Sequence, residues 1–281
     1  MKKDKDNKLK KKYGIETGSF EDGLTYARMG DKSEILINIE ALQYKHEPPS
    51  GFTLKEFIKT ANIFSDNYSV YLIGRRPNLP KNYLMPDMAN DYATMIRREF
   101  KKPVDIMGIS TGGQIAQYLA VDHPDVVRKL VILSAAYRIS KSGAKIEKKA
   151  ADYFEKGKVG KSLASTLDLV FSNRIVKNIA KFFVWMLGKK LLGEIQYPND
   201  FLIETRADRE MNLKERLKEI KAPTLLISGE LDVCYNAADV RLMAEEIPNA
   251  KSIIYEKYGH SLTHSNRDEV NQKVLEFLKD E

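Results

Sequence analysis

Cysteine is nearly absent from this chain, and long apolar runs are missing altogether. The single cysteine, Cys234, excludes an internal disulfide and suits a reducing, cytoplasmic setting. No stretch reaches the ~18 uninterrupted apolar residues that a membrane span requires, so the sequence predicts no span. The N-terminus is basic but has no apolar segment, which is not typical of a secretory signal. We therefore expect a cytoplasmic protein, whose oligomeric state the sequence leaves open.

Positive charge is concentrated at the N-terminus. Residues 1–12 hold seven lysines and two aspartates, which account for five of the seven net positive charges. Such a polar segment cannot bury apolar surface, so we predict a basic, disordered tail over residues 1–15. A solubilising tail is the simplest interpretation, with contact to an anionic surface as the alternative. The rest of the chain is close to neutral, and we expect no nucleic-acid partner.

Apolar runs of strand length alternate with helical patterns along most of the chain. This alternation predicts an α/β fold, with a mostly parallel sheet covered by helices on both faces. The runs are too short for buried helices, whereas the segments between them show helical spacing. The principal predicted strands lie within residues 35–39, 68–74, 104–110, 129–137, 223–232 and 251–261.

Strand-like runs are missing between residues 141 and 215, where lysine-rich helical patterns replace them. We predict a helical insertion there, in a core formed by residues 16–140 and 216–281. The segment 175–192 is rich in large apolar residues, but Lys177 and Lys181 interrupt it as a membrane span. It is expected to pack against the core or to form a wall of an apolar acyl pocket. Its lysines would also suit contact with a lipid surface.

A strand-like pattern changes abruptly to a helical one within the pentapeptide GISTG, where Ser110 stands between Gly108 and Gly112. A strand that turns this sharply into a helix strains the central residue and requires small residues on both sides. Such a turn exposes the serine hydroxyl and directs N–H groups of the helix start at whatever the serine attacks. A phosphate-binding turn is the alternative, but neither G-x-G-x-x-G nor a P-loop lysine is present.

A nucleophilic serine requires a histidine base and an acid that orients the base. In this fold they follow in the order serine, acid, histidine, each after a later strand. Glu230 and Asp232 follow the run 223–229, and His260 follows the last predicted strand. The chain has only four histidines, and one of them stands where the base is required.

Together these segments resemble the α/β-hydrolase superfamily. "MGISTGGQIAQYLA" is similar to the family's nucleophile segment, and "ISGELD" and "YGHS" are similar to its acid and histidine segments. The resemblance covers about residues 20–140 and 216–281. It implies Ser110 as nucleophile, Asp232 as acid and His260 as base, with residues 141–215 as a helical lid. Asp232 is preferred to Glu230 because it lies three residues after the strand-end glycine.

One departure from the family concerns the oxyanion hole, the pair of N–H donors that stabilises a tetrahedral intermediate. The family usually carries His-Gly after its third strand, and this chain has "NIEAL" there. We predict one donor at the backbone of Thr111 and the other at Glu40 or Ala41. The Glu40 carboxylate is expected to turn away, since its charge would oppose an oxyanion.

A second departure is "GRRPNLP", which resembles the family's Asp-Arg-Arg-Gly-x-Gly segment. Its Arg75 and Arg76 suit either an acidic substrate group or, more simply, nearby carboxylates of the protein. His46 is expected to be a solvated loop residue, and Cys234 a small buried side chain without a nucleophilic role. His264 lies four residues after His260, but no carboxylate stands between them. We predict no metal site and no cofactor.

These features predict a serine hydrolase that cleaves a carboxylic ester, or a related acyl bond, of a small and partly apolar substrate. The acyl group would be held on Ser110 as an acyl-enzyme. An acyltransferase, a thioesterase or a lactonase could use the same triad. A ligand-binding protein on a hydrolase fold, without catalysis, is the alternative from another class, and the missing His-Gly is its best support.

Overall fold

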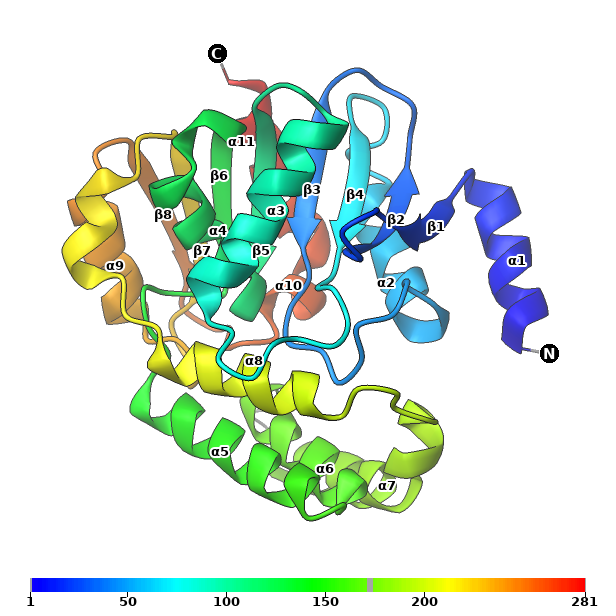
Figure 1. Ribbon diagram of the computed structural model, residues 1–281. Helices are drawn as coiled ribbons and strands as arrows, with labels where there is room; N and C mark the ends of the chain where they lie inside the picture. The colour runs from blue at the N-terminus through cyan, green and yellow to red at the C-terminus, as the bar shows by residue number, and fades with distance from the viewer. Residues whose placement is uncertain (1, 171–173, 281) are drawn as a thin grey trace.

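Within residues 2–170 and 174–280, which the computed structural model describes, eight strands form one central sheet (Figure 1). Their order across the sheet is β1-β2-β4-β3-β5-β6-β7-β8. The bounds are β1 (Glu16–Ser19), β2 (Thr25–Met29), β3 (Ile35–Ile39), β4 (Ser69–Ile73), β5 (Val104–Ile109), β6 (Val127–Leu133), β7 (Thr224–Gly229) and β8 (Ala250–Tyr255).

All neighbouring strands from β4 to β8 in this order pair in parallel, whereas β1 and β2 add an antiparallel edge. In β3 every residue is buried, as expected of a strand covered on both faces. Ile37 pairs with Tyr71 of β4 on one side and with Ile106 of β5 on the other. The predicted mostly parallel α/β sheet is confirmed.

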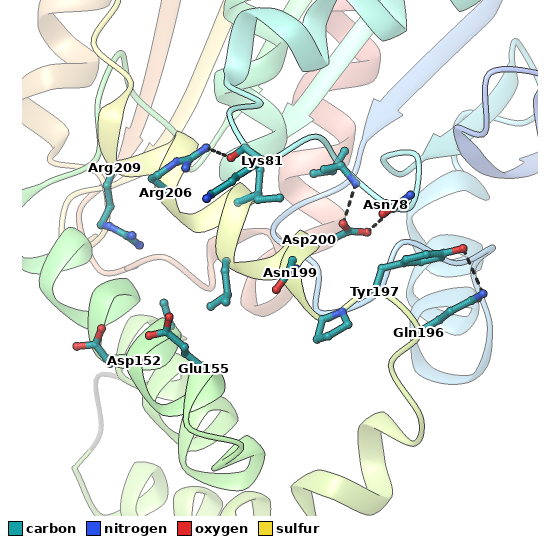
Figure 2. A pocket seen from close by; sticks show the side chains of 15 residues that line it. Asn78, Lys81, Asp152, Glu155, Gln196, Tyr197, Asn199, Asp200, Arg206 and Arg209 are labelled. Carbon is teal, nitrogen blue, oxygen red and sulfur yellow. Dashed lines mark hydrogen bonds between the residues drawn. The ribbon is translucent and has the colours of Figure 1, made fainter.

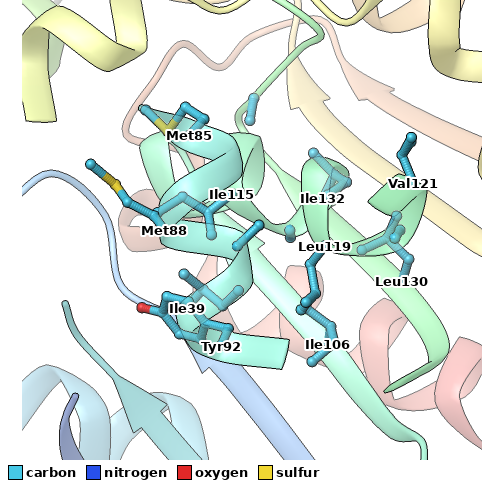
Figure 3. Packing of buried hydrophobic residues seen from close by; sticks show 14 of the residues in the cluster. Ile39, Met85, Met88, Tyr92, Ile106, Ile115, Leu119, Val121, Leu130 and Ile132 are labelled. Atoms are coloured by element: carbon cyan, nitrogen blue, oxygen red, sulfur yellow. The ribbon is translucent and has the colours of Figure 1, made fainter. Parts of the chain in front are cut away.

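Helices cover both faces of this sheet. One apolar core joins the sheet to α3, α4 and α9, and a second joins the opposite face to α2 and α11. In the first core, Ile39, Ile106, Ile115 and Leu119 pack together with Tyr92, whose hydroxyl donates to Ile73 O (Figure 3). The helices are α2 (Gly51–Ala61), α3 (Met85–Glu99), α4 (Thr111–Asp122), α9 (Ala237–Glu246), α10 (Leu262–Ser265) and α11 (Arg267–Lys279), with 3-10 turns at Pro124–Val126 and Lys214–Glu219.

A group of helices follows β6 and lies at one end of the sheet (Figure 1). It consists of α5 (Lys141–Glu155), α6 (Val159–Val170), α7 (Arg174–Leu192) and α8 (Asn199–Glu210). These helices fall inside the stretch predicted as a helical insertion. The backbones of α6 and α7 approach closely at Gly160 and Gly188, because a Cβ on Gly160 would collide with Trp185 O. This group is called the helical insertion below.

The outer face of α7 departs from the expected packing. Phe182 and Phe183 are each 52 % exposed, Trp185 is 50 % exposed and Met186 is 56 % exposed. The expectation that this apolar segment packs against the core or forms a pocket wall is therefore wrong for these side chains. Among the described residues, no helix has the length and apolar character needed to cross a bilayer.

The N-terminal segment also differs from its prediction. Residues Lys2–Tyr13 form helix α1 and are not a disordered tail. Lysine has a good helix propensity, and basic side chains in the last turn suit the negative end of the helix dipole. Asp6 is buried and accepts a hydrogen bond from Gly51 N at 2.9 Å, which attaches α1 to the start of α2. This contact to the core was not visible in the composition of the segment.

Candidate active site

The predicted nucleophile stands between β5 and α4, at the turn itself. Ser110 has φ 54° and ψ −125°, a strained conformation for a residue with a side chain. Its N–H donates to Leu133 O at 3.0 Å, which holds the turn against β6. The strain is the one that the sequence pattern predicts.

The two glycines beside Ser110 are required by close backbone approaches. A Cβ on Gly108 would collide with Gly112 O, and a Cβ on Gly112 would collide with Ile39 O at the end of β3. The turn is therefore folded back on itself and also pressed against the neighbouring strand. Any larger side chain at either position has to displace backbone, which is the costly kind of rearrangement.

The predicted base and acid meet Ser110 from two later strand ends. Ser110 Oγ lies 3.1 Å from His260 Nε2, and His260 Nδ1 lies 2.9 Å from Asp232 Oδ2. His260 comes from the connection between β8 and α10, and Asp232 follows β7. The structure brings together three residues that are 28 to 150 positions apart in sequence. Their order along the hydrogen-bonded row is Ser110, His260, Asp232, which is the order that the sequence predicts for nucleophile, base and acid.

Asp232 is held by more than the imidazole. Its Oδ1 accepts hydrogen bonds from Cys234 N at 2.7 Å and from Tyr235 N at 3.1 Å. Two amide donors fix the orientation of this buried carboxylate toward His260. The rival acid Glu230 is instead half-exposed and forms an ion pair with Arg241. The preference for Asp232 over Glu230 agrees with this geometry.

The predicted oxyanion donors differ in whether their backbone N–H groups are already hydrogen-bonded within the protein. Glu40 N donates to Ile73 O at 3.0 Å in the sheet, so this N–H is not available to a substrate and the choice of Glu40 is wrong. Within the described residues, the N–H groups of Ala41 and Thr111 have no acceptor. These two donors remain as candidates. Ala41 lies just after β3, and Thr111 is the first residue of α4.

The Glu40 side chain turns toward the end of β4 and away from Ser110, as expected. A Cβ on Gly74 would lie 3.4 Å from its Oε2, and Arg75 hydrogen-bonds Glu40 O and Ala41 O. Burial raises the pKa of the Glu40 carboxyl to about 7, although the positive charge of Arg75 opposes this shift. Arg75 thus holds the segment that would supply the second oxyanion donor, through the carbonyl oxygens of Glu40 and Ala41.

Comparison with known proteins identifies the family. Residues 80–267 match the model of the family described as serine aminopeptidase, S33, which is two thirds of the chain. The chain belongs to this family of α/β hydrolases.

Solved structures and curated relatives resemble this α/β hydrolase over most of its length. An α/β-hydrolase enzyme from a Medee basin deep-sea metagenome library aligns with a TM-score of 0.79 and 17 % identity, covering 95 % of this chain and 98 % of that one. The enol-lactonase from Burkholderia xenovorans LB400 aligns with a TM-score of 0.74 and 18 % identity, covering 94 % and 100 %. The pimeloyl-[acyl-carrier protein] methyl ester esterase of Chromobacterium violaceum is 23 % identical over 239 residues, which cover 79 % of this chain and 89 % of the relative.

In this α/β hydrolase, α8 of the helical insertion contacts the nucleophile turn directly. Thr111 Oγ1 donates to Asp208 Oδ2 at 2.8 Å, and Tyr235 OH donates to both Asp208 oxygens at 3.2 Å. Burial raises the pKa of Asp208, and burial together with the nearby Asp208 charge raises the pKa of Glu147 well above its usual range. Both carboxyl groups therefore hold a proton more readily than they would in water, and Asp208 accepts hydrogen bonds from Thr111 and Tyr235.

A second group of buried charges lies along the same helix. Arg75 forms an ion pair with Glu204, and His46 Nε2 lies 3.0 Å from Glu204 Oε2. Burial favours neutral His46, but hydrogen bonds to Asp200 and Glu204 outweigh it and raise the pKa of His46 to about 9. The expectation of a solvated His46 is wrong, because this side chain is buried among carboxylates. Arg75 pairs with a carboxylate of the protein, which is the simpler of the two interpretations given for it above.

The buried carboxylates were missed at the level of sequence, although a signal was present. Asp200, Glu204 and Asp208 are spaced four residues apart in α8 and therefore share one face of the helix. Acidic residues on one face are usually solvated, so the spacing alone did not indicate burial. The decisive fact is which neighbours cover that face, and these come from the loops after β3, β4 and β7.

A cleft of about 780 Å³ lies beside α8 and is lined also by α5 and by the 78–81 loop (Figure 2). Its lining includes Asn78, Lys81 and Arg206, and Asp200 accepts hydrogen bonds from Asn78 N and Leu79 N at its rim. Ser110 is 8 % exposed and does not line this cleft. Helix α8 therefore borders this cleft and also contacts Thr111, the residue after Ser110, through Asp208.

The side chains of Cys234 and His264 take no part in the hydrogen-bonded row of Ser110, His260 and Asp232. Cys234 is buried, and burial raises the pKa of its thiol well above the usual range, which disfavours the nucleophilic thiolate. His264 is exposed, and its Nδ1 lies 3.3 Å from Glu56 Oε2. In the part of the chain that the structure describes, no three His, Cys, Asp or Glu side chains are grouped to hold a metal.

Proposed function

We propose that this α/β hydrolase is a serine esterase that cleaves a carboxylic ester, or a related acyl bond, through an acyl-enzyme on Ser110. The observation that carries the proposal is the continuous hydrogen-bonded row from Ser110 Oγ through His260 to Asp232 Oδ2. This row has the roles and the geometry of a nucleophile, a general base and an orienting acid. Esterase and lactonase relatives support the same reaction class.

In the proposed reaction, His260 Nε2 takes the proton of Ser110 Oγ as the oxygen attacks the carbonyl carbon. The tetrahedral oxyanion then lies near the N–H groups of Thr111 and Ala41. When the intermediate collapses, the carbon–oxygen bond to the alcohol breaks and His260 gives its proton to the leaving oxygen. Water repeats the sequence on the acyl-enzyme and releases the acid. Asp232 fixes the tautomer of His260 and stabilises the imidazolium in both halves.

The helical insertion is proposed to act as the lid over this site. Support comes from the Thr111–Asp208 hydrogen bond, which joins the insertion to the turn, and from the low exposure of Ser110. The substrate is proposed to be small and partly apolar. A panel of acyl esters of graded chain length, with lactones and thioesters, would assign the bond and the acyl length.

Labelling by a fluorophosphonate probe, together with hydrolysis of a short p-nitrophenyl ester, tests the proposal. Ser110→Ala is expected to abolish labelling and to lower turnover by about 10⁴-fold or more. Ser265→Ala is the matched control, because it removes an exposed serine hydroxyl that bonds only Ser261 O nearby. Equal labelling or equal turnover in Ser110→Ala would refute the assignment. Ligand binding without any labelling of the wild-type protein would favour the non-catalytic alternative.

A further inference from the structure

Helix α7 presents a row of large apolar side chains to solvent. Six of them, each at least half exposed, define what we call the α7 face: Ile179, Phe182, Phe183, Trp185, Met186 and Leu191. The rings contact one another, with centroids of Phe182 and Phe183 5.7 Å apart and those of Phe182 and Trp185 6.1 Å apart. A contiguous exposed apolar surface of this kind marks an interaction site in a folded protein.

The α7 face is not needed to hold the helix in place. Contacts to α6 use the opposite side of α7, where Gly188 is buried and its Cβ position lies against Gly160. Lys177 and Lys181 on that side pair with Asp168 of α6, at 3.5 and 2.7 Å. Packing of the helical insertion therefore leaves the α7 face available.

The charge of α7 has one sign. Its sequence, RIVKNIAKFFVWMLGKKLL, contains no acidic residue. Lys189 and Lys190 at its end are exposed and, within the described residues, form no ion pair. Exposed aromatic and aliphatic side chains flanked by lysines are the composition of a helix that lies in the interface of an anionic bilayer.

We propose that the α7 face docks on the surface of a bilayer containing anionic lipids. The apolar side chains enter the boundary between headgroups and acyl chains, to a depth of about 5–10 Å, and Lys189 and Lys190 meet lipid phosphates. A second copy of the chain fits less well, because another α7 offers these lysines no acidic partner. Docking does not depend on the proposed esterase activity, and Ser110→Ala is expected to dock like the wild-type protein.

The only tryptophan of the chain, Trp185, lies within the α7 face and reports on it directly. Full-length protein is titrated with phosphatidylcholine vesicles that contain about 30 % phosphatidylglycerol, and with vesicles of phosphatidylcholine alone. We expect a blue shift of Trp185 emission and quenching by brominated acyl chains with the anionic vesicles. High salt should weaken the response, since ionic screening acts on the lysine contribution.

Two pairs of variants separate the α7 face from other surfaces. Phe182→Ser is expected to weaken vesicle binding roughly tenfold through lost apolar burial, whereas Phe52→Ser, at an exposed phenylalanine of α2, leaves it unchanged. Lys189→Gln with Lys190→Gln should weaken binding by about fivefold per lysine. Lys251→Gln with Lys257→Gln removes the same charge from exposed positions around β8 and should have little effect.

Several outcomes would overturn the proposal. An unchanged Trp185 spectrum with anionic vesicles would exclude insertion of the α7 face, even if the basic helix α1 bound the vesicles. Equal losses in Phe182→Ser and Phe52→Ser would show that the effect is not specific to α7. A blue shift that needs no lipid, rises with protein concentration and accompanies a doubled mass would assign the face to a second copy of the chain.

Discussion

Thr111 donates its hydroxyl hydrogen bond to Asp208 at 2.8 Å, and this bond joins the first residue of the nucleophile helix to the helical insertion. The backbone N–H of the same threonine is a proposed oxyanion donor. Asp208 thus acts on the position of that donor and does not contact the reacting atoms in the proposed reaction. We therefore propose Asp208 as a positioning residue for the turn.

Removal of this hydroxyl should therefore lower turnover. Thr111→Val keeps the shape and the backbone N–H but leaves the buried Asp208 with one donor fewer. We expect kcat to fall about tenfold, with a loss of roughly 1–3 kcal/mol in the free energy of unfolding. Thr94→Val is the control, because Thr94 bonds only Asn90 O on the exposed side of α3. If KM alone changed in Thr111→Val, the positioning role would be excluded.

The two acids after β7 should differ sharply in their contribution to activity. Asp232→Asn is expected to lower kcat by about 10³- to 10⁴-fold, because an amide no longer fixes the His260 tautomer or stabilises its charged form. Glu230→Gln, two residues away, should retain most activity, since Glu230 pairs with Arg241 at the surface. The measurement is the rate of ester hydrolysis by each variant, with its thermal unfolding midpoint compared with that of the wild-type protein to confirm that it is folded. A larger loss in Glu230→Gln would reverse the assignment of the acid.

Glu40 should make the protein less stable as the pH rises. The pKa of Glu40 is raised from 4.5 to about 7 in the folded protein, so the folded state binds more protons than the unfolded state between these values. This contribution is present below about pH 4.5 and is lost as the pH rises through about 7, to an extent on the order of 3 kcal/mol. Glu40→Gln should flatten the dependence, as measured by urea unfolding at several pH values. An unchanged slope would contradict the buried, proton-binding state of Glu40.

His46 should act in the same direction at higher pH. Its pKa is raised from 6.5 to about 9 in the folded protein, so its stabilising contribution is complete below about 6.5 and is lost as the pH rises through about 9. The expected loss is on the order of 3 kcal/mol. His46→Gln should remove this fall from urea unfolding curves between these pH values. An NMR titration that gave the His46 ring a pKa below 6.5 would contradict the prediction.

The parts of the site that the sequence predicts are those that follow strand ends. Ser110 directly follows a recognisable apolar run, and Asp232 and His260 stand within a few residues of the ends of two others; a parallel sheet places such ends at one edge. The glycines of the turn are predictable for the same local reason. Their positions follow from backbone geometry and chain order, with no knowledge of how distant segments pack.

The parts that the sequence does not predict depend on packing between distant segments. His46 looks like a loop residue until Glu204 and Asp200 are placed beside it. Glu40 is as plausible a donor as Ala41 until β4 takes its N–H. The apolar α7 suggests burial, because composition cannot reveal that one face of a helix remains uncovered. The helix α1 similarly depends on the contact between Asp6 and α2.

Helix α8 is attached at both ends to different parts of the core. Asp200 accepts N–H groups of Asn78 and Leu79 at the cleft, and Asp208 holds Thr111 at the nucleophile turn. The two attachments are separated by about 12 Å of rigid helix. Asn78 and Leu79 belong to the loop after β4, whereas Thr111 begins α4. One helix therefore supports both the loop that lines the cleft and the first residue of α4.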